Sequence, residues 1–550
     1  MRTPMLLITC CTLFLGNLHA QVPDWSWATS INGPGYDYIQ ALTTDAEGNV
    51  YCTGGFTSPS ITLGSFTLTN SSNPNTFGDL FVAKVAPDGT VLWAMDTDGP
   101  HGEGGNAIAL DHQGNIYVLG GFGGIDFTYA GSTFTSQGAS DLLLVKYAPS
   151  GTPLWARKAG STGQDDPSAL TIDPDGNAII SGQWQGSTLT VGSFTTSNAG
   201  GLDNVYAKYD PDGTLLWATS FGGTGVDFCS GLATDALGNI YSAGSFYSTT
   251  LSIGGTTLTN NGSNDLYVAK FTPGGTAVWA YSAGGSGAES VTGLLFDGAG
   301  SLVISGVFLG DDLTLGATTL TNASAGDQEM YLTRFTTDGE PLWATSLGIT
   351  GADWTGRQIG MDGGGNIYLP IGYEAPSITV GVSTLTNVDG VDTFVAKFTP
   401  DGVPIWAAAA GGAGYESPQG ITTDPEGNVY VCGYYQGGFP LTIGTTALPA
   451  SASYDSFLAR LGDFNVGVAG TGGATGLMGS YWNAGIGELR LRSSATSAID
   501  CTVYTAQGAR VAGQRFVGST TLQLQEQSPG VYVVVLRTGE QQQTLKLIRE

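Results

Sequence analysis

The sequence predicts an all-β fold: a seven-bladed β-propeller of about 62-residue repeats, followed by a small C-terminal β-sandwich. Two observations lead to this prediction. One turn-and-strand unit recurs seven times along the chain, and the repeats show no helical periodicity. A tryptophan marks each copy, at intervals of 62 to 66 residues: Trp27, Trp93, Trp155, Trp217, Trp279, Trp343 and Trp406. A fixed period means that one supersecondary unit is reused, so seven copies predict seven blades.

Each repeat contains four core strands and one small hairpin. Two short apolar runs flank a turn of the form DxxGN, which is the pattern of a β-hairpin. A Thr- and Leu-rich segment with a central Gly follows, as at 61–70, and predicts the small hairpin. A strand such as 392–397 then leads through a PDG turn to the Trp strand. The DxxGN turns begin at Asp45, Asp111, Asp173, Asp235, Asp297, Asp362 and Asp424. A right-handed β-solenoid is the main alternative, but its coils repeat over roughly 20–30 residues.

The ends of the repeat region predict how the ring closes. The region begins with the Trp strand at 25–30 and ends on the strand at 455–461, before another Trp strand appears. The last blade therefore lacks one strand, and the first strand of the chain is spare. We expect 25–30 to pair antiparallel with 455–461, which removes an exposed sheet edge. The propeller domain is placed at 21–464.

The N-terminus has the pattern of a secretory signal peptide. Arg2 precedes an apolar run, and the segment ends on a small residue, which predicts cleavage between Ala20 and Gln21 and residues 1–20 as the signal. A lipoprotein anchored through Cys10 or Cys11 is the alternative, but both cysteines come too early in the apolar run. No other stretch approaches the roughly 20 apolar residues of a spanning helix, so an exported protein without a transmembrane helix is expected.

Charge is distributed unevenly along the chain. Residues 21–486 contain 10 Lys and Arg against 41 Asp and Glu, whereas 487–550 contain seven and five. Such a negative field repels phosphate backbones, so nucleic acid is a poor partner and is not expected to bind. Acidity of this kind is compatible with cation binding, and it also keeps an extracellular surface soluble.

Four cysteines follow the signal peptide: Cys52, Cys229, Cys432 and Cys501. They form no CxxC pair and have no His at metal-ligand spacing, which argues against zinc. Ring closure makes the strands of Cys52 and Cys432 neighbours. Packed sheets lie about 10 Å apart, however, and a disulfide needs Cα atoms within roughly 7 Å. We expect small core residues rather than a disulfide.

The repeat unit DxxGNxYxxGxF…DxFVAKxxPDGxxLWA resembles the bacterial β-propeller repeat family often called SBBP, over residues 25–464. That family is known as an architecture of exported and surface proteins. The resemblance supplies no catalytic motif.

Residues 487–550 resemble a second family, the type A sorting domain of the Bacteroidetes type IX secretion system. The resemblance rests on three segments, which contain Tyr504 and Gly508, then Gly530 and Tyr532, then Lys546. It implies a small β-sandwich that directs passage across the outer membrane by the type IX machinery, after which the product is released or attached to the surface. The usual opening motif is replaced by 488–492, of sequence ELRLR. A Gly-rich linker is placed at 465–486.

Acidic residues recur as Gly-x-Asp/Glu where the chain passes between blades: Asp37, Asp165, Asp227, Glu289, Asp353 and Glu416. Because these links lead to the inner strands, we expect the carboxylates to gather around one mouth of the central channel. Hard oxygen donors there suit Ca²⁺ or a cationic ligand. In the structural alternative, which the recurrence favours, each acid accepts hydrogen bonds from backbone N–H groups. No other cofactor is expected.

Basic residues recur nine positions before each following Trp, with one more in the last repeat: Lys84, Lys146, Lys208, Lys270, Arg334, Lys397 and Arg460. Across the PDG hairpin this spacing places cation and indole on adjacent strands. We interpret the pairing as blade packing with a cation–π component.

Departures from the repeat are the better indications of a ligand. Trp354 has no counterpart in the other copies, and Tyr415 is a similar irregularity. Trp354 near the channel mouth can stack on a sugar or peptide, or it can be a buried loop aromatic. Catalytic residues are not expected, since His101 and His112 are the only histidines after the signal and neither has an evident partner.

The sequence therefore predicts a secreted or cell-surface binding or adhesion module, with a glycan or protein as its extracellular ligand. Two alternatives remain open. The first is a propeller enzyme such as a quinone-dependent dehydrogenase, to whose Trp-docking repeats the segment DGTxLWA has a faint similarity. The second is a passive component of a surface layer.

Overall fold

The computed structural model describes residues 22–549 apart from 72–77, 98, 100–101, 125–126, 325, 437, 451–452, 463–476, 484–487, 494–497, 506–507, 518, 525–529 and 539–540. The signal peptide with its cleavage site at Ala20 and Gln21, Cys10, Cys11 and His101 lie outside the described residues. Every secondary-structure element in the described residues is a β-strand, which confirms the predicted all-β class. No described helix has the length and apolarity to cross a bilayer.

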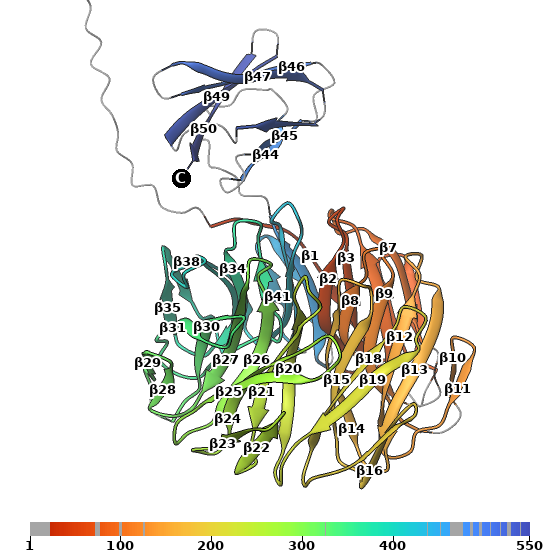
Figure 1. The fold of residues 1–550 in the computed structure, drawn as a ribbon. Helices are drawn as coiled ribbons and strands as arrows, with labels where there is room; N and C mark the ends of the chain where they lie inside the picture. Colours follow the sequence, from red (N-terminus) through yellow and green to blue (C-terminus); the bar gives the residue numbers. More distant parts are fainter. Residues whose placement is uncertain are drawn as a thin grey trace, which may run out of the picture.

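The propeller consists of antiparallel four-stranded sheets arranged around a central channel (Figure 1). In the first six blades the strands follow the chain outward from the channel. The inner strands are β2 (Asp37–Thr44), β8 (Glu103–Leu110), β14 (Asp165–Ile172), β20 (Asp227–Thr234), β26 (Glu289–Phe296), the pair β32 (Asp353–Thr355) and β33 (Gly360–Met361), and β39 (Glu416–Thr423). The second strands are β3 (Val50–Phe56), β9 (Ile116–Phe122), β15 (Ala178–Trp184), β21 (Ile240–Phe246), β27 (Ser301–Phe308), β34 (Ile367–Tyr373) and β40 (Val429–Tyr435).

The third and outer strands complete the blades, which we number one to seven in the order of their inner strands. The third strands are β6 (Asp79–Val85), β12 (Asp141–Tyr147), β18 (Asp203–Tyr209), β24 (Asp265–Phe271), β30 (Glu329–Thr336), β37 (Asp392–Phe398) and β43 (Asp455–Leu461). The outer strands are β7 (Val91–Asp96), β13 (Pro153–Ser161), β19 (Leu215–Phe221), β25 (Ala277–Ala283), β31 (Pro341–Thr345), β38 (Pro404–Gly412) and β1 (Trp25–Ile31).

A small hairpin stands between the second and third strand of each blade, as the sequence predicts. These hairpins are β4 (Ser60–Leu63) with β5 (Phe66–Thr69), β10 (Phe127–Tyr129) with β11 (Ser132–Phe134), β16 (Thr188–Val191) with β17 (Phe194–Ser197), β22 (Thr250–Ile253) with β23 (Thr256–Thr259), β28 (Asp312–Leu315) with β29 (Thr318–Thr321), β35 (Ser377–Val380) with β36 (Ser383–Thr386), and β41 (Leu441–Ile443) with β42 (Thr446–Leu448).

The first strand of the chain completes the last blade. β1 pairs antiparallel with β43, so that Trp27 faces Arg460 and Ser30 faces Phe457. This is the pairing that the sequence predicts for 25–30 and 455–461. The exposed edge of β43 is thereby covered, which removes a template for edge-to-edge association.

The repeated tryptophans join neighbouring blades. The indole N–H of Trp27 donates to the Pro87 carbonyl at 2.9 Å, and that of Trp217 donates to the Pro273 carbonyl at 3.0 Å. In each case the acceptor belongs to the PDG-type turn of the next blade. Gly275 in that turn has a φ of +80°, and a Cβ there would lie 3.0 Å from the Trp217 ring, so a side chain would be strained. The tryptophans are therefore part of the scaffold.

Five of the seven repeated cations lie over a tyrosine ring, and not only beside the indole that was expected as their partner. Lys84 is paired with Trp93 in the β6–β7 register, but its Nζ lies 4.8 Å from the centroid of Tyr51 and 3.0 Å from Asp45. The turn carboxylate draws the ammonium group toward the inner strands and away from the indole. The same cation–tyrosine contact recurs for Lys146 with Tyr117, Lys270 with Tyr241, Lys397 with Tyr368 and Arg460 with Tyr430.

Cys52, Cys229, Cys432 and Cys501 are all free and buried. The prediction of core residues rather than a Cys52–Cys432 disulfide is confirmed. Burial raises the pKa of the Cys52 thiol to about 12, so it stays protonated and unreactive.

The C-terminal residues form two further sheets. The first sheet contains β44 (Leu477–Asn483), β45 (Glu488–Ser493) and β48 (Ser519–Gln523), in that order. The second sheet contains β46 (Ile499–Thr505), β47 (Arg510–Phe516), β49 (Gly530–Thr538) and β50 (Gln541–Arg549), in the order β47-β46-β49-β50. Leu491 of the first sheet and Val534 of the second belong to one apolar cluster. β44 lies within the segment 465–486, so the second half of the expected linker is strand.

The residues of the sorting-domain resemblance fall on adjacent strands of the second sheet. Tyr504 lies in β46, Gly530 and Tyr532 in β49, and Lys546 in β50. The register places Tyr504 opposite Val533, and Val533 opposite Lys546. Gly508, in the turn between β46 and β47, has a φ of +87°, which favours glycine.

Candidate ligand-binding site

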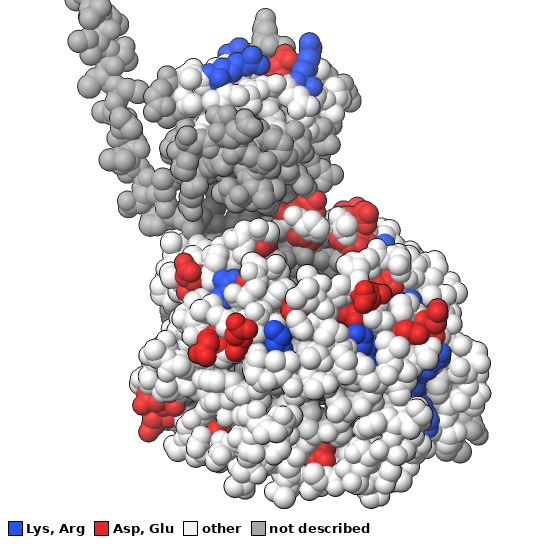
Figure 2. All heavy atoms as spheres, viewed as in Figure 1, with Lys and Arg blue, Asp and Glu red and all other residues white. Residues whose placement is uncertain are grey.

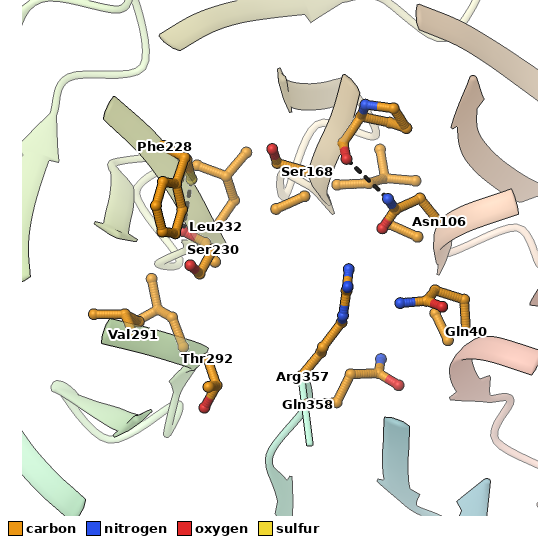
Figure 3. A pocket seen from close by; sticks show the side chains of 18 of the residues that line it. Gln40, Asn106, Ser168, Phe228, Ser230, Leu232, Val291, Thr292, Arg357 and Gln358 are labelled. Carbon is orange, nitrogen blue, oxygen red and sulfur yellow. Dashed lines mark hydrogen bonds between the residues drawn. The ribbon is translucent and has the colours of Figure 1, made fainter. Parts of the chain in front are cut away.

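Alternation along the inner strands decides which side chains reach the channel. Successive residues of a strand point to opposite faces. The acid that begins each inner strand points between the blades, and the second residue points toward the channel. The fourth residue is the extra residue of a β-bulge in the regular inner strands, and it faces the cavity. The fourth positions place Gln40, Asn106, Ser168, Ser230 and Thr292 on a cavity of about 480 Å³ (Figure 3). Its wall is therefore rich in amide and hydroxyl groups.

The six carboxylates considered as Ca²⁺ ligands do not gather at a channel mouth. They are at most 2% exposed and lie in separate blade junctions: Asp37, Asp165, Asp227, Glu289, Asp353 and Glu416. The expectation was wrong because the first residue of an inner strand points sideways into the neighbouring blade. Asp37 illustrates the contacts, since it accepts hydrogen bonds from the Ser58 hydroxyl at 2.6 Å and the Ser58 amide at 3.1 Å.

Each junction acid has a second carboxyl group as its neighbour, from the start of the third strand in the preceding blade. Asp353 interacts electrostatically with Glu329, and burial followed by this repulsion raises the pKa of Asp353 to about 8. Burial likewise raises the pKa of Glu289 to about 7, with Asp265 adding to the rise. Two acids at a junction are too few for a metal cage, and the described residues contain no group of three or more His, Cys, Asp or Glu suited to a metal ion.

Blade six departs from this regular arrangement. Asp353 precedes its turn aspartate, Asp362, by nine residues, whereas the corresponding interval is eight in the other copies. The second strand also carries Pro370, which cannot donate a ladder hydrogen bond. The inner strand consequently breaks into β32 and β33, and residues 356–359 leave the sheet, with the Gly356 amide donating to the Pro370 carbonyl at 2.8 Å. We call 356–359 the blade-six bulge.

The blade-six bulge is held by contacts with the two following blades. The Arg357 amide donates to the Gln419 carbonyl at 2.7 Å. The Gln358 side chain accepts from the Leu42 amide at 2.9 Å and donates to the Leu42 carbonyl at 2.8 Å. Because both ends of the bulge are fixed in this way, the Arg357 side chain projects into the cavity (Figure 3).

Six aromatic rings form a connected arc beside Arg357, which we call the aromatic arc. Its members are Trp354, Tyr415, Tyr434, Tyr454, Tyr36 and Tyr38. Neighbouring centroids lie between 5.3 and 6.4 Å apart, as in Trp354–Tyr415, which are stacked at 6.1 Å and 18°. Tyr36 is 41% exposed, and the other five are half-buried. Solvent therefore reaches the rings of blades six, seven and one.

Trp354 has structural counterparts that the sequence pattern did not reveal. It occupies the second position of its inner strand, as do Tyr38 and Phe228. The ring lies over Gly372 of β34, where a Cβ would approach Trp354 to 2.6 Å. A glycine on the second strand thus makes room for the indole at the mouth of the channel.

The structure brings together the two ligand candidates of the sequence, Trp354 and Tyr415, and adds residues that were not considered. Tyr36, Tyr38, Tyr434, Tyr454 and Arg357 come from distant segments, and ring closure makes them neighbours. One signal was readable in the sequence: the nine-residue interval between Asp353 and Asp362 marks an insertion that contains Arg357.

The fold and this site define a β-propeller repeat protein with an open, aromatic channel mouth. A model described as "Beta-propeller repeat" (SBBP) matches residues 216–245 and 405–440, and one described as a domain of unknown function (DUF5122) β-propeller matches 251–277.

Among curated proteins the chain is similar to an uncharacterized WD repeat-containing protein, L264, of Acanthamoeba polyphaga mimivirus, 24% identical over 447 residues. That match covers 65% of this chain and 32% of the relative. The regulatory protein FlaEY of Caulobacter vibrioides is 24% identical over 284 residues, covering 48% of this chain and 29% of that protein. The matches thus span about a third of the length of these relatives. Among solved structures, the Neurospora crassa Pan2 WD40 domain is 10% identical, with a TM-score of 0.37, covering 80% of this chain and 98% of that domain.

Proposed function

We propose that this protein is an exported, non-catalytic binding module that recognises an extracellular ligand at the mouth of its propeller. The aromatic arc is the observation that carries the proposal. Rings that are left half-buried and accessible contribute little to the core, whereas they offer flat apolar faces on which sugar rings or peptide side chains can stack.

The composition of the cavity favours binding over catalysis. Its described lining residues contribute amides, hydroxyls and one guanidinium, but no carboxylate and no histidine. General acid–base chemistry commonly uses those two groups within reach of a substrate. The proposed enzyme alternative, a quinone-dependent dehydrogenase, has no support from this lining.

The remainder of the proposal concerns location. The signal peptide and the similarity of 487–550 to type IX sorting domains support export through the periplasm and across the outer membrane, with release or surface attachment. Acidic side chains are spread over the visible face of the propeller (Figure 2), as suits a soluble extracellular surface.

Glycan-array and pull-down experiments with the mature full-length protein test the binding function. We expect saturable binding that Trp354→Ala weakens at least about fivefold, because one stacked ring contributes roughly 1 kcal/mol or more. Tyr129→Ala is the matched control, since Tyr129 is a half-buried tyrosine in the outer hairpin strand β10. An absence of saturable binding would instead favour a passive surface-layer component, and equal losses in both variants would contradict the proposed location.

A further inference from the structure

Arg357 is unusual among the basic residues of the propeller. Seven of the 10 Lys and Arg in 21–486 are the repeated cations, which leaves Arg157, Lys158 and Arg357. The Arg157 Nε donates to the Gly213 carbonyl at 2.6 Å, and the Lys158 Nζ lies 3.6 Å from Asp141. Both of these cations are satisfied within the fold. Arg357 instead projects into the cavity.

The surroundings of Arg357 supply neutral groups only. In the amide orientation that satisfies both residues, the Gln40 oxygen accepts from Arg357 Nε at 2.9 Å and from one terminal nitrogen at 3.0 Å. The charged or ionisable groups that act on the guanidinium are the hydroxyls of Tyr434, Tyr36 and Tyr38. Within the part of the chain that the structure describes, no carboxylate forms an ion pair with it.

The guanidinium of Arg357 lies in the cavity without a carboxylate partner, and the residue is exposed to solvent there. Partial desolvation lowers the pKa of Arg357 from its usual value, but arginine remains charged in proteins. A carboxylate or sulfate that reaches this exposed charge can accept two parallel hydrogen bonds from it. The five donors of a guanidinium exceed what Gln40 alone can accept.

The position of the aromatic arc limits what kind of anion fits. Tyr36, Tyr38 and Tyr434 stand next to the guanidinium and continue through Tyr415 to Trp354. A ligand that reaches both features needs an anionic group and, next to it, several flat faces with apolar C–H surface. Sugar rings that carry acid groups have this combination.

We propose that the channel mouth binds an acidic saccharide, with its carboxylate or sulfate paired to Arg357 and its neighbouring sugar rings stacked on the aromatic arc. This inference rests on the proposed binding function and names the ligand class for the same site. The polar wall that Gln40, Asn106 and Ser168 provide offers hydrogen bonds to the sugar hydroxyls.

Calorimetric titration of the mature protein with three tetrasaccharides tests the proposal. Cellotetraose is the neutral probe, tetragalacturonate carries carboxylates, and a chondroitin sulfate tetrasaccharide carries carboxylates and sulfates. We expect at least one acidic probe to bind about tenfold or more tightly than the neutral probe, because pairing with Arg357 outweighs the repulsion from the acidic surface of the propeller. The stronger of the two acidic probes identifies which anion the site prefers.

Variants of Arg357 separate charge from fold. Arg357→Met is expected to lose about tenfold or more in affinity for the acidic probe and to leave the neutral probe unchanged. Arg357→Lys should retain part of the affinity, because it keeps the charge but not the bidentate geometry. Arg157→Met is the control: a cation outside the cavity whose loss should leave the relative affinities as they are. Melting temperatures of all the variants check that folding is intact.

Four outcomes would overturn the inference. If cellotetraose binds as tightly as the acidic probes, or if Arg357→Met leaves acidic binding unchanged, the charge plays no part in recognition while the binding function stands. If inorganic sulfate alone binds as tightly as the sulfated tetrasaccharide, the site recognises a free anion and the sugar is irrelevant. If the three probes all fail to bind while the array yields another ligand, the ligand class is wrong and the proposed function survives.

Discussion

Blade four and blade six are built from the same repeat but place different side chains at the channel. In blade four the inner strand β20 runs unbroken from Asp227 to Thr234 and offers the small Ser230. In blade six one extra residue and Pro370 break the strand, and Arg357 extends into the cavity. The scaffold residues, including both repeat tryptophans, are retained in either case. The comparison indicates that the repeated residues stabilise the propeller, whereas the insertion determines which side chains line the cavity.

The largest expected effect comes from removing the strand that completes the scaffold. Deletion of residues 22–31 leaves β43 without its outer partner and uncovers a sheet edge. We expect the melting temperature to fall by more than about 10 °C, with aggregation. Differential scanning calorimetry measures it.

Deletion of Gly356 is the matched control for this experiment, because it restores the eight-residue interval and removes one residue from the blade-six bulge. Its melting temperature should stay within about 3 °C of the unaltered protein. If the two deletions were equally harmful, the distinction between scaffold and insertion would be lost.

The second effect compares two tryptophans. Trp217→Ala removes an indole that donates to Pro273 and packs on Gly275 of the next blade, and we expect it to reduce the free energy of unfolding by about 3 kcal/mol. Trp354→Ala removes a half-buried ring of the aromatic arc and should reduce it by about 1 kcal/mol or less. Denaturant unfolding gives both values. A greater loss for Trp354 would show that the arc is part of the core.

The third and smallest effect concerns pH, and it tests the buried acids at the blade junctions. Burial raises the pKa of Asp165 to about 6, of Glu289 to about 7 and of Asp353 to about 8, and raises that of Glu416 as well. A raised pKa in the folded state means that folding favours the protonated acid. This stabilisation is complete below the unfolded pKa values, near 4, and is lost as the pH rises through about 6 to 8.

We therefore expect the melting temperature to decrease between pH 5 and pH 9, by about 5 °C or more. Asp353→Asn should raise the melting temperature at pH 9 and make it less dependent on pH. The turn aspartate Asp173 behaves differently: although burial opposes it, hydrogen bonds from Asn177 and Lys208 keep its pKa low, so its contribution to stability is complete above pH 5. A melting temperature that rises with pH over this range would contradict the interpretation.

Much of the fold could be predicted from the sequence, because each repeat records its own strands and turns. The pairing of β1 with β43 and the buried state of Cys52 and Cys432 followed from the period alone. The junction acids were placed on the wrong side because the argument considered the path of the chain and not the alternation of side chains within the inner strand. Asp37 is buried at a blade junction, whereas Gln40, the extra residue of the β-bulge in the same strand, lines the cavity.

Most of the site could not be predicted. Tyr36 and Tyr454 are 418 residues apart in the sequence, yet their rings lie 6.1 Å apart once the ring has closed. No local sequence pattern indicates that these two rings lie close together. The insertion in blade six was visible as an interval, but its effect depends on Pro370 of another strand and on Leu42 and Gln419 of other blades.

The strand β1 also determines when the propeller can complete its folding. It precedes every other strand of the propeller, and its partner β43 is synthesised more than 400 residues later. A contact of such long range forms late and slowly. Until β43 emerges, β1 has no place to dock and the ring stays open. Completion of the fold, and with it the contact of Tyr36 with Tyr454 at the mouth, therefore requires nearly the whole propeller sequence to be available.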